Sequence, residues 1–122
     1  MEELTFSQKK YLFAIYQLGI NQGSVKSTEI AKIVGVSKSS TASMTAKLCE
    51  SGYLEKAYYG QVVLTEKGLS IAKNIYQKTM LISHFLQNQL SVPSEQAVKD
   101  AVSIALYVSE NTVNQIINYF SF

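Results

Sequence analysis

The chain of 122 residues contains one cysteine, one histidine, one proline, no tryptophan and no arginine, so all eleven cationic side chains are lysines. A single cysteine excludes an intrachain disulfide and a zinc ribbon. A single histidine, His84, leaves little room for an imidazole-rich metal site or a Ser-His-Asp triad. The sequence also lacks a glycine-rich phosphate loop and a paired-carboxylate constellation. We therefore expect a protein that is not an enzyme.

Long apolar runs are absent as well. No stretch of about 18 uncharged apolar residues exists, so no membrane span is expected. The N-terminal segment MEELTFSQKK has no basic start followed by an apolar run, and it does not resemble a signal peptide. The lone thiol of Cys49 agrees with a reducing compartment. These features predict a cytoplasmic protein.

Charge is distributed unevenly, although the formal net charge is only +2. Residues 1–78 hold ten lysines and six glutamates, a balance of +4. Residues 79–122 hold one lysine and three acidic residues, a balance of −2. The cationic part and the neutral-to-acidic, apolar part are therefore expected to have different functions.

Hydrophobic spacing in the cationic part predicts a helix over residues 6–20 capped by Ser7, a turn over 21–24, and a helix at TEIAKIV capped by Ser27 or Thr28. A GVS turn containing Gly35 leads to a helix from Lys38 to Ser51, capped by Ser37. Two helices joined by such a turn are typical of a helix-turn-helix. Ala31 is small where the two helices approach, and their shared core is predicted from Ile30, Val34, Val36, Met44 and Leu48.

A β-hairpin is predicted directly after these helices, with strands near residues 53–58 and 61–64 and a turn at Tyr59-Gly60, and an irregular loop is the alternative. A hairpin in this place makes the unit a winged helix-turn-helix. Three later helices are expected at about 66–90, 94–108 and 110–120, the first capped by Thr65 and the last by Ser109. The buried stripe of the long helix is predicted from Leu69, Ala72, Ile75, Tyr76, Ile82 and Leu86. The fold is therefore expected to be mainly α.

The helix from Lys38 is rich in hydroxyl side chains, which weaken a helix interior. Its inward face is predicted from Thr41, Met44 and Leu48, and its outward face from Ser37, Lys38, Ser39, Ser40, Ala42, Ser43 and Lys47. A merely solvated polar face is the alternative to DNA contact. Short donors and acceptors are useful on a helix that faces base edges and phosphates, and the wing adds lysine and tyrosine. Backbone N–H groups at the start of the TEIAKIV helix could hold a phosphate. For the wing tyrosines, packing on the protein body is the alternative to contact with phosphate or the minor groove. The predicted DNA-binding residues are Lys26, Thr28, Ser37, Lys38, Ser39, Ser40, Ser43, Lys47, Lys56, Tyr58, Tyr59 and Gln61.

The last two predicted helices are apolar on nearly all sides between residues 101 and 108, which a lone surface helix would not be. Either they form the core of a small domain, or they contribute half of a dimer interface. Helix-turn-helix proteins commonly bind two half-sites as symmetric dimers, which favours the second interpretation. The predicted interface consists of Val98, Ala101, Val102, Ala105, Leu106, Val113 and Ile117.

Three segments carry a family resemblance: YLFAIYQL (11–18), EIAKIVGVSKSSTASMTAKL (29–48) and GYLEKAYYGQVVLTEKG (52–68). With these segments, the sequence resembles the iron- and manganese-dependent repressors of the diphtheria-toxin-repressor family, most closely the short manganese-responsive branch. The resemblance implies a winged helix-turn-helix DNA-binding domain over residues 1–68. It also implies a helical dimerisation domain over 69–122, linked to the first by the long helix.

The resemblance also implies a metal site, because family members use Mn²⁺ or Fe²⁺ held by carboxylates and histidines. The positions that it assigns to those ligands are occupied here by Lys10, Phe13, Thr79, Val102, Ala105 and Leu106. None of these side chains is a suitable ligand for such an ion. We therefore predict no metal cofactor, and we expect apolar side chains to fill the former metal cavity.

The sequence as a whole predicts a homodimeric transcriptional regulator, a repressor by resemblance, that binds a double-stranded DNA operator and is not activated by metal at the usual site. Two alternatives stay open. One is a metal-responsive repressor with a relocated site, built from Glu95, Asp100 or Glu110 with His84. The other is a module that forms heterodimers with a related repressor and modulates it.

Overall fold

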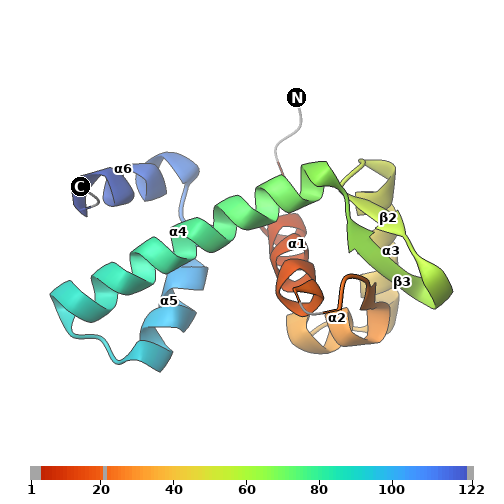
Figure 1. Cartoon of the computed structure of the whole chain (residues 1–122), viewed down its shortest axis with the longest axis horizontal. Coiled ribbons are helices and arrows are strands. Elements are labelled where there is room, and N and C mark those ends of the chain that lie inside the picture. Colours follow the sequence, from red (N-terminus) through yellow and green to blue (C-terminus); the bar gives the residue numbers. More distant parts are fainter. Residues whose placement is uncertain (1–3, 21, 121–122) are drawn as a thin grey trace. The chain divides into compact units, whose positions relative to one another are not determined.

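The computed structural model describes residues 4–20 and 22–120, which form six α-helices and a three-stranded antiparallel sheet (Figure 1). The chain divides into two compact units, residues 1–73 and 74–122, and the long helix α4 (Glu66–Leu90) continues through the boundary. A mainly helical chain with a winged helix-turn-helix followed by further helices is the predicted fold class, and it is confirmed. The predicted turn at 21–24 includes residue 21, which lies outside the described residues.

Three helices of the first unit begin close to the predicted positions, but two of their caps differ. Helix α1 (Phe6–Gly19) is capped by Thr5 and not by Ser7, because Thr5 and Gln8 exchange hydrogen bonds in a capping box. Helix α2 (Ser27–Val34) follows Lys26, so neither Ser27 nor Thr28 is its N-cap. Helix α3 (Lys38–Glu50) is capped by Ser37, as predicted, whose Oγ accepts from the backbone N–H of Ser40 at 3.0 Å.

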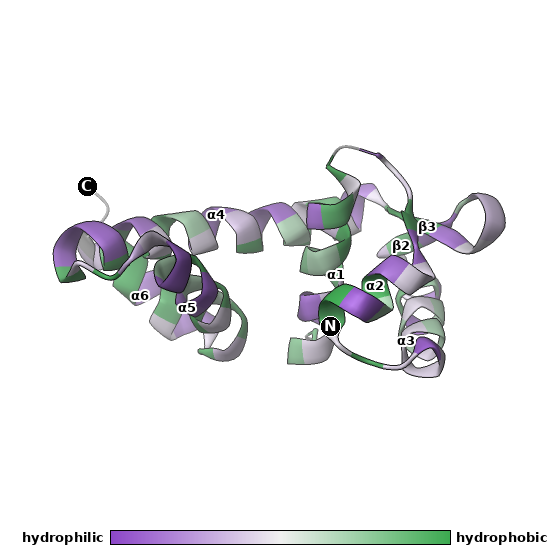
Figure 2. Ribbon diagram, turned by 90° about the horizontal axis from the view of Figure 1, so that it is seen from below, coloured by the Kyte–Doolittle hydropathy of each residue, from purple (hydrophilic) through white to green (hydrophobic). Residues whose placement is uncertain are grey.

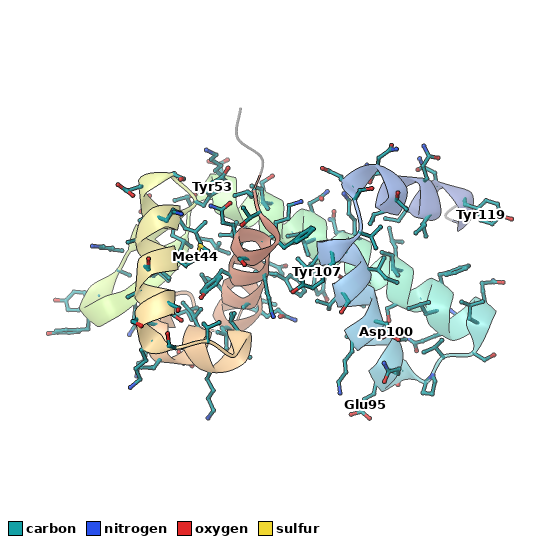
Figure 3. All side chains as sticks on the ribbon, turned by 180° about the vertical axis from the view of Figure 1, so that it is seen from behind. Met44, Tyr53, Glu95, Asp100, Tyr107 and Tyr119 are labelled. Atoms are coloured by element: carbon teal, nitrogen blue, oxygen red, sulfur yellow. The ribbon has the colours of Figure 1, made fainter. Side chains whose placement is uncertain are left out.

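The turn between α2 and α3 depends on Gly35, which adopts a left-handed conformation with φ 80° and donates its N–H to the carbonyl of Ala31. Ala31 is buried, in agreement with its predicted place at the close approach of the helices. Met44 points from α3 toward α1 and packs on the core (Figure 3). Val36 was wrongly predicted to be in this core: it lies in the turn, where no helix face directs it inward, and is 39% exposed.

The predicted hairpin is confirmed as strands β2 (Leu54–Lys56) and β3 (Gln61–Leu64), joined by one turn, η1 (Tyr58–Gly60). A third strand, β1 (Val25–Lys26), pairs with β3, so that the strand order is β1-β3-β2. Two residues are too few for a visible alternation of apolar and polar side chains, which is why β1 was not predicted. Val25, Leu54 and Val62 are buried against the core of the three helices. We refer to residues 54–64 as the wing.

Hydrogen bonds join the start of α4 to the segment between α3 and β2. Thr65 Oγ1 donates to the carbonyl of Gly52 at 2.7 Å and accepts from the N–H of Gly68 at 3.1 Å. Lys67 Nζ donates to the carbonyl of Ser51 at 3.2 Å and lies 4.4 Å from the centre of the Tyr53 ring. Thr65 therefore caps α4, as predicted, and also fixes where the helix leaves the wing.

The second unit contains the rest of α4 with α5 (Ser94–Tyr107) and α6 (Glu110–Phe120), and its core is formed by Ile82, Ala101 and Val113. Ser109 caps α6 by accepting from the N–H of Thr112 at 3.3 Å, as predicted. Polar and apolar residues alternate along α4, as Figure 2 shows, but its buried stripe differs from the prediction. Tyr76 is 37% exposed, whereas Thr79 and Ser83 are buried, because helical geometry places these two residues on the face of Ile75 and Ile82.

Gly68 supplies a stability test of the contact at the start of α4. A Cβ added there would lie 2.1 Å from the carbonyl oxygen of Tyr53, a backbone atom that cannot move aside cheaply. We expect Gly68→Ala to lower the free energy of unfolding by about 1–3 kcal/mol, measured by urea denaturation. The matched control is Gly19→Ala, whose Cβ would make an ordinary 3.5 Å contact with Val25. Equal stability of the two variants would contradict the close approach.

Candidate nucleic-acid interface

Helix α3 presents a polar face to solvent. All seven residues that were predicted to face outward are exposed: Ser37, Lys38, Ser39, Ser40, Ala42, Ser43 and Lys47. Thr41 and Leu48 are buried on the opposite face, as predicted, and Thr45 is buried with them, which was not predicted. Because the buried face fixes the orientation of the helix, the exposed side chains are available for a partner outside the protein.

Local hydrogen bonds account for several hydroxyl groups of α3. Ser37 Oγ lies 2.9 Å from Ser40 Oγ and 3.2 Å from Ser39 Oγ, around the start of the helix. Thr41 Oγ1 donates to the carbonyl of Ser37, and Thr45 Oγ1 donates to that of Ala42. The high hydroxyl content of this helix is therefore partly a feature of capping and burial, and it is a weaker indication of DNA contact than the exposure of Ser43, Lys38 and Lys47.

The start of α2 and the wing lie close to each other. Ser27 Oγ donates to the carbonyl of Gly60 at 3.1 Å, and Ser24 Oγ donates to Gln61 Oε1. Lys26 and Thr28 are exposed beside this contact, whereas Gln61 is half-buried and its side-chain oxygen is occupied. Of these predicted DNA-binding residues, Gln61 is thus the one whose side chain already has a structural role.

The wing tip carries two tyrosines that extend into solvent. Tyr58 is 74% exposed and Tyr59 is 89% exposed, so the alternative that they pack on the protein body is wrong. Lys56 is exposed in the strand that leads to them. A groove of about 390 Å³ separates α3 from the wing, with Ala42, Ala46 and Cys49 on one side and Lys56, Ala57 and Gly60 on the other. Most of these wall residues are small, and Lys56 is the exception.

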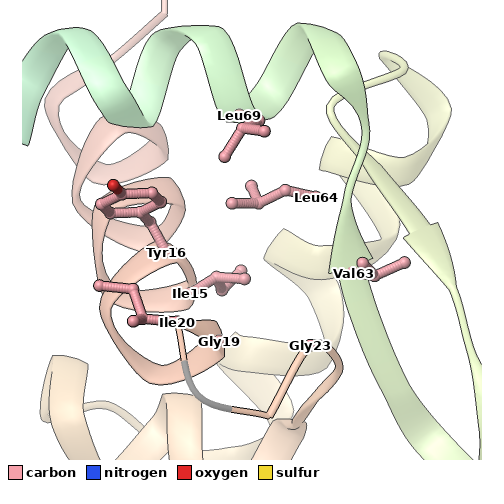
Figure 4. Close-up of a pocket in the computed structure, with 8 residues that line it drawn as sticks. All are labelled: Ile15, Tyr16, Gly19, Ile20, Gly23, Val63, Leu64 and Leu69. Atoms are coloured by element: carbon pink, nitrogen blue, oxygen red, sulfur yellow. The ribbon is translucent and has the colours of Figure 1, made fainter.

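A second hollow in the same unit is apolar. Its volume is about 200 Å³, and α1, β3 and the start of α4 contribute its walls, including Ile15, Tyr16, Leu64 and Leu69 (Figure 4). No residue that lines it is charged, so this hollow has neither the carboxylates of a metal site nor the cations of a phosphate site.

The predicted dimer-interface residues divide into two groups. Ala101, Leu106 and Val113 are at most 3% exposed, so they form the core of their own unit and their prediction as interface residues is wrong. Val102, Ala105 and Ile117 are half-buried, and Val98 is 44% exposed. Helical periodicity cannot separate a helix face buried inside a chain from one buried between chains. The same unit exposes further large apolar side chains that were not predicted: Tyr76, Met80, Leu81, Leu90, Tyr107 and Tyr119.

The positions that the resemblance assigns to metal ligands hold no carboxylate and no imidazole. Lys10, Val102 and Ala105 are half-buried, whereas Phe13, Thr79 and Leu106 are buried. Thr79 Oγ1 has no hydrogen-bond partner among the described residues. One neutral hydroxyl is the only side-chain oxygen that these six residues provide.

The residues of the alternative, relocated metal site are exposed and dispersed in the second unit. Asp100 accepts a hydrogen bond from Gln96 at 2.9 Å, and Glu110 pairs with Lys78 at 3.5 Å. Glu95 and Asp100 point away from α5 (Figure 3). In residues 4–20 and 22–120, no three His, Cys, Asp or Glu side chains come together in a group that could hold a metal ion.

A winged helix-turn-helix with exposed lysines on its second helix, followed by a helical unit with exposed apolar side chains, defines a DNA-binding transcriptional regulator. Residues 3–62 match the model of the iron dependent repressor N-terminal DNA binding domain, and residues 65–122 match that of the iron dependent repressor metal binding and dimerisation domain. The chain belongs to the iron-dependent repressor family, whose members are transcriptional regulators and not enzymes.

Individual relatives agree with this assignment. The chain is 31% identical over 111 residues to an uncharacterised HTH-type transcriptional regulator of Methanocaldococcus jannaschii, covering 90% of this chain and 89% of that protein. It is 31% identical over 119 residues to the HTH-type transcriptional regulator MntR of Oceanobacillus iheyensis, covering 95% of this chain and 80% of that protein.

Solved structures share the fold over nearly the whole chain. The crystal structure of T. acidophilum IdeR has a TM-score of 0.80 and 21% identity, covering 100% of this chain and 56% of that one. The structure of ScaR with bound Zn²⁺ has a TM-score of 0.72 and 29% identity, covering 92% and 54%. The chain thus spans little more than half the length of these two structures. No helix in the described part of the chain is long and apolar enough to cross a bilayer.

Lys47 provides a test of the α3 face. We expect Lys47→Gln to weaken duplex binding and to reduce the slope of log affinity against log salt by about 0.9 for each phosphate that the lysine neutralises. Lys99→Gln is the control, because Lys99 is also exposed but lies on α5. Titration of labelled duplex at several salt concentrations measures both quantities. An unchanged slope for Lys47→Gln would remove Lys47 from the interface.

Thr79 provides a test of its buried hydroxyl. A buried hydroxyl without a partner is unfavourable, and valine has nearly the same shape without the polar atom. We expect Thr79→Val to raise the free energy of unfolding by about 1 kcal/mol, measured by urea denaturation at fixed protein concentration. Thr79→Ser, which keeps the hydroxyl and removes the methyl group, is expected to lower it. A loss of stability in Thr79→Val would mean that the hydroxyl has a partner.

Proposed function

We propose that this chain is a homodimeric repressor that binds its DNA operator without a metal ion at the family's usual site. The observation that carries the proposal is a contrast within the chain. The face of α3 and the wing expose the lysines and hydroxyl groups that DNA binding needs. The six positions assigned to metal ligands, in contrast, offer only one neutral hydroxyl.

Coordination chemistry supports the metal-independent part of the proposal. Mn²⁺ and Fe²⁺ need several oxygen or nitrogen ligands, most of them carboxylates or imidazoles. Phe13, Val102 and Leu106 provide none, and the ammonium group of Lys10 repels a cation. The residues at these positions therefore do not fit the ion, and no step of DNA binding is assigned to it.

Surface chemistry supports the DNA-binding part. Four lysines, Lys26, Lys38, Lys47 and Lys56, are exposed on the start of α2, on α3 and on the wing. Without arginine, the chain has no guanidinium group for a two-bonded contact with guanine. Lysines supply affinity through phosphates, and Ser43 with its neighbours supplies short contacts to base edges. Binding is then modest in affinity and strongly dependent on salt.

The second unit supports the homodimeric part. Its exposed apolar residues include Met80, Leu81, Val98 and Tyr107, which are between 41% and 49% exposed. Apolar side chains gathered on one small unit are typical of an interaction surface. A symmetric dimer would place two copies of α3 about one helical turn of DNA apart, which suits a palindromic operator.

The test of this function is selection of bound duplexes from a random pool, in chelator and in added Mn²⁺. We expect one palindromic sequence to be enriched in both conditions, and its dissociation constant to change less than about twofold between them, because no ligand set responds to the ion. Strengthening by Mn²⁺ of more than tenfold would contradict the metal-independent part.

Three further measurements separate the alternatives. Calorimetry of the chain with Mn²⁺ addresses the relocated site of His84, Glu95, Asp100 and Glu110, and heat of binding that disappears in His84→Ala would favour it. Enrichment of DNA only after a ligand-bearing relative is added would favour the heterodimer. Light scattering of the purified chain at twice the monomer mass supports the homodimer directly.

A further inference from the structure

The turn at the wing tip holds an aromatic residue in an unfavourable backbone conformation. Tyr59 has φ 47° and ψ 58°, in the left-handed region, and Gly60 follows with φ 71°. Two successive residues with positive φ form the kind of tight turn that usually has Asn, Asp or Gly first. A bulky residue in the left-handed region is strained, because its Cβ lies too close to the following carbonyl oxygen. The Tyr59 ring buries little surface against the body of the protein, because it is 89% exposed.

The two tyrosines form a preformed pair. The rings of Tyr58 and Tyr59 meet edge to face with their centres 4.7 Å apart and their planes at 65°. This is a favourable geometry for aromatic side chains. The pair therefore projects two phenol groups together from the tip, while both remain 74–89% exposed.

The base beneath the pair is firmly held. Ala57 donates its N–H to the carbonyl of Gln61 at 2.8 Å, and Ser27 holds the carbonyl of Gly60 from the start of α2. Strand β1 pairs with β3 on the other side, with Lys26 opposite Gln61. The hairpin tip extends beyond the helices of its unit in both Figure 1 and Figure 2. The tyrosines are thus carried on a rigid support.

Charge around the support is favourable to DNA. Lys26 and Lys56 are both exposed at the base of the wing. Glu55, the nearest acidic residue of the strand, alternates with Lys56 and so points to the other face of the strand. Between the wing and α3 lies the groove of about 390 Å³, whose walls are mostly small residues and which Lys56 also lines. The groove therefore lies between the exposed face of α3 and the wing, next to Lys56.

We propose that the wing tip enters the minor groove of the operator next to the bases that α3 contacts, and that Tyr58 and Tyr59 select A·T pairs there; this rests on the proposed function. The phenol O–H groups donate to N3 of adenine or O2 of thymine on the groove floor. The exocyclic amino group of guanine blocks the same approach. The chain contains no arginine, so the tyrosine pair supplies the minor-groove contact in place of an arginine side chain.

Inosine substitution tests this directly, because I·C resembles G·C in the major groove and A·T in the minor groove. The probe is the selected duplex with the pairs flanking each α3 contact changed to G·C or to I·C. We expect the G·C flank to weaken binding by about tenfold and the I·C flank to restore it, since one good base contact discriminates on this scale. Equal binding to all three flanks would overturn the proposal.

Two variants complete the test. Tyr59→Asn places a residue that tolerates the left-handed conformation in the turn, so its melting temperature should equal or exceed that of the wild type. Tyr58→Ala changes the neighbouring residue, which has ordinary backbone geometry. Both should bind the A·T flank about tenfold more weakly and lose the flank preference.

The outcomes distinguish this proposal from the proposed function. If the wild-type chain selects no duplex, the proposed function fails and the wing proposal fails with it. If the wild type binds and Tyr59→Asn keeps the full flank preference at unchanged affinity, the wing proposal alone is overturned. If Lys47→Gln weakens binding while its preference for A·T and I·C over G·C survives, the two surfaces act separately, as the proposal requires.

Discussion

The close contact between the first turn of α4 and the backbone of residues 51–53 determines how the DNA-binding surface is held. Gly68 lets the helix approach the carbonyl of Tyr53, Thr65 bonds Gly52, and Lys67 bonds Ser51. Residues 51–53 lie between the end of α3 and the start of β2. Because α3 and the wing diverge from this point, a shift here would change the groove between them. The contact therefore helps to hold α3 and the wing, the two elements proposed to contact DNA, in their relative positions.

Much of the fold could be predicted, because the capping residues, turn glycines and hydrophobic spacing in the sequence mark the same elements that the structure contains. Gly35 and Ser37 mark the helix-turn-helix, Thr65 and Ser109 mark helix starts, and the hairpin follows from its alternation. The errors have a common cause. Tyr76 and Val36 are apolar, which suggested burial, but position in the fold determines whether a side chain is buried. Val36 lies in a turn, and on α4 the buried positions are occupied by Thr79 and Ser83 instead of Tyr76.

The candidate site was less predictable than the fold. Side-chain type identified the exposed face of α3. It could not show that Ser37 bonds both Ser39 and Ser40, or that the side-chain oxygen of Gln61 accepts from Ser24. Likewise, apolar character could not separate Ala101 and Val113, which form the core of their unit, from Val98, which remains exposed. The left-handed Tyr59 has no sequence signal beyond the glycine that follows it.

The absence of arginine connects these observations. Because the chain has no guanidinium group, it has no rigid fork for a two-bonded contact with guanine, and its lysines act as flexible point charges. In the proposed complex, contact of the wing with a second groove adds sequence information that α3 alone does not provide. A rigid wing is needed for this, since a mobile tip would lose entropy on binding and offset the gain. Ser27 bonds the turn at Gly60, Ser24 bonds the first residue of β3, and Tyr59 keeps a strained backbone conformation. A wing held at its base, with strain at its tip, is the arrangement expected of a structure that serves contact with a partner more than folding stability.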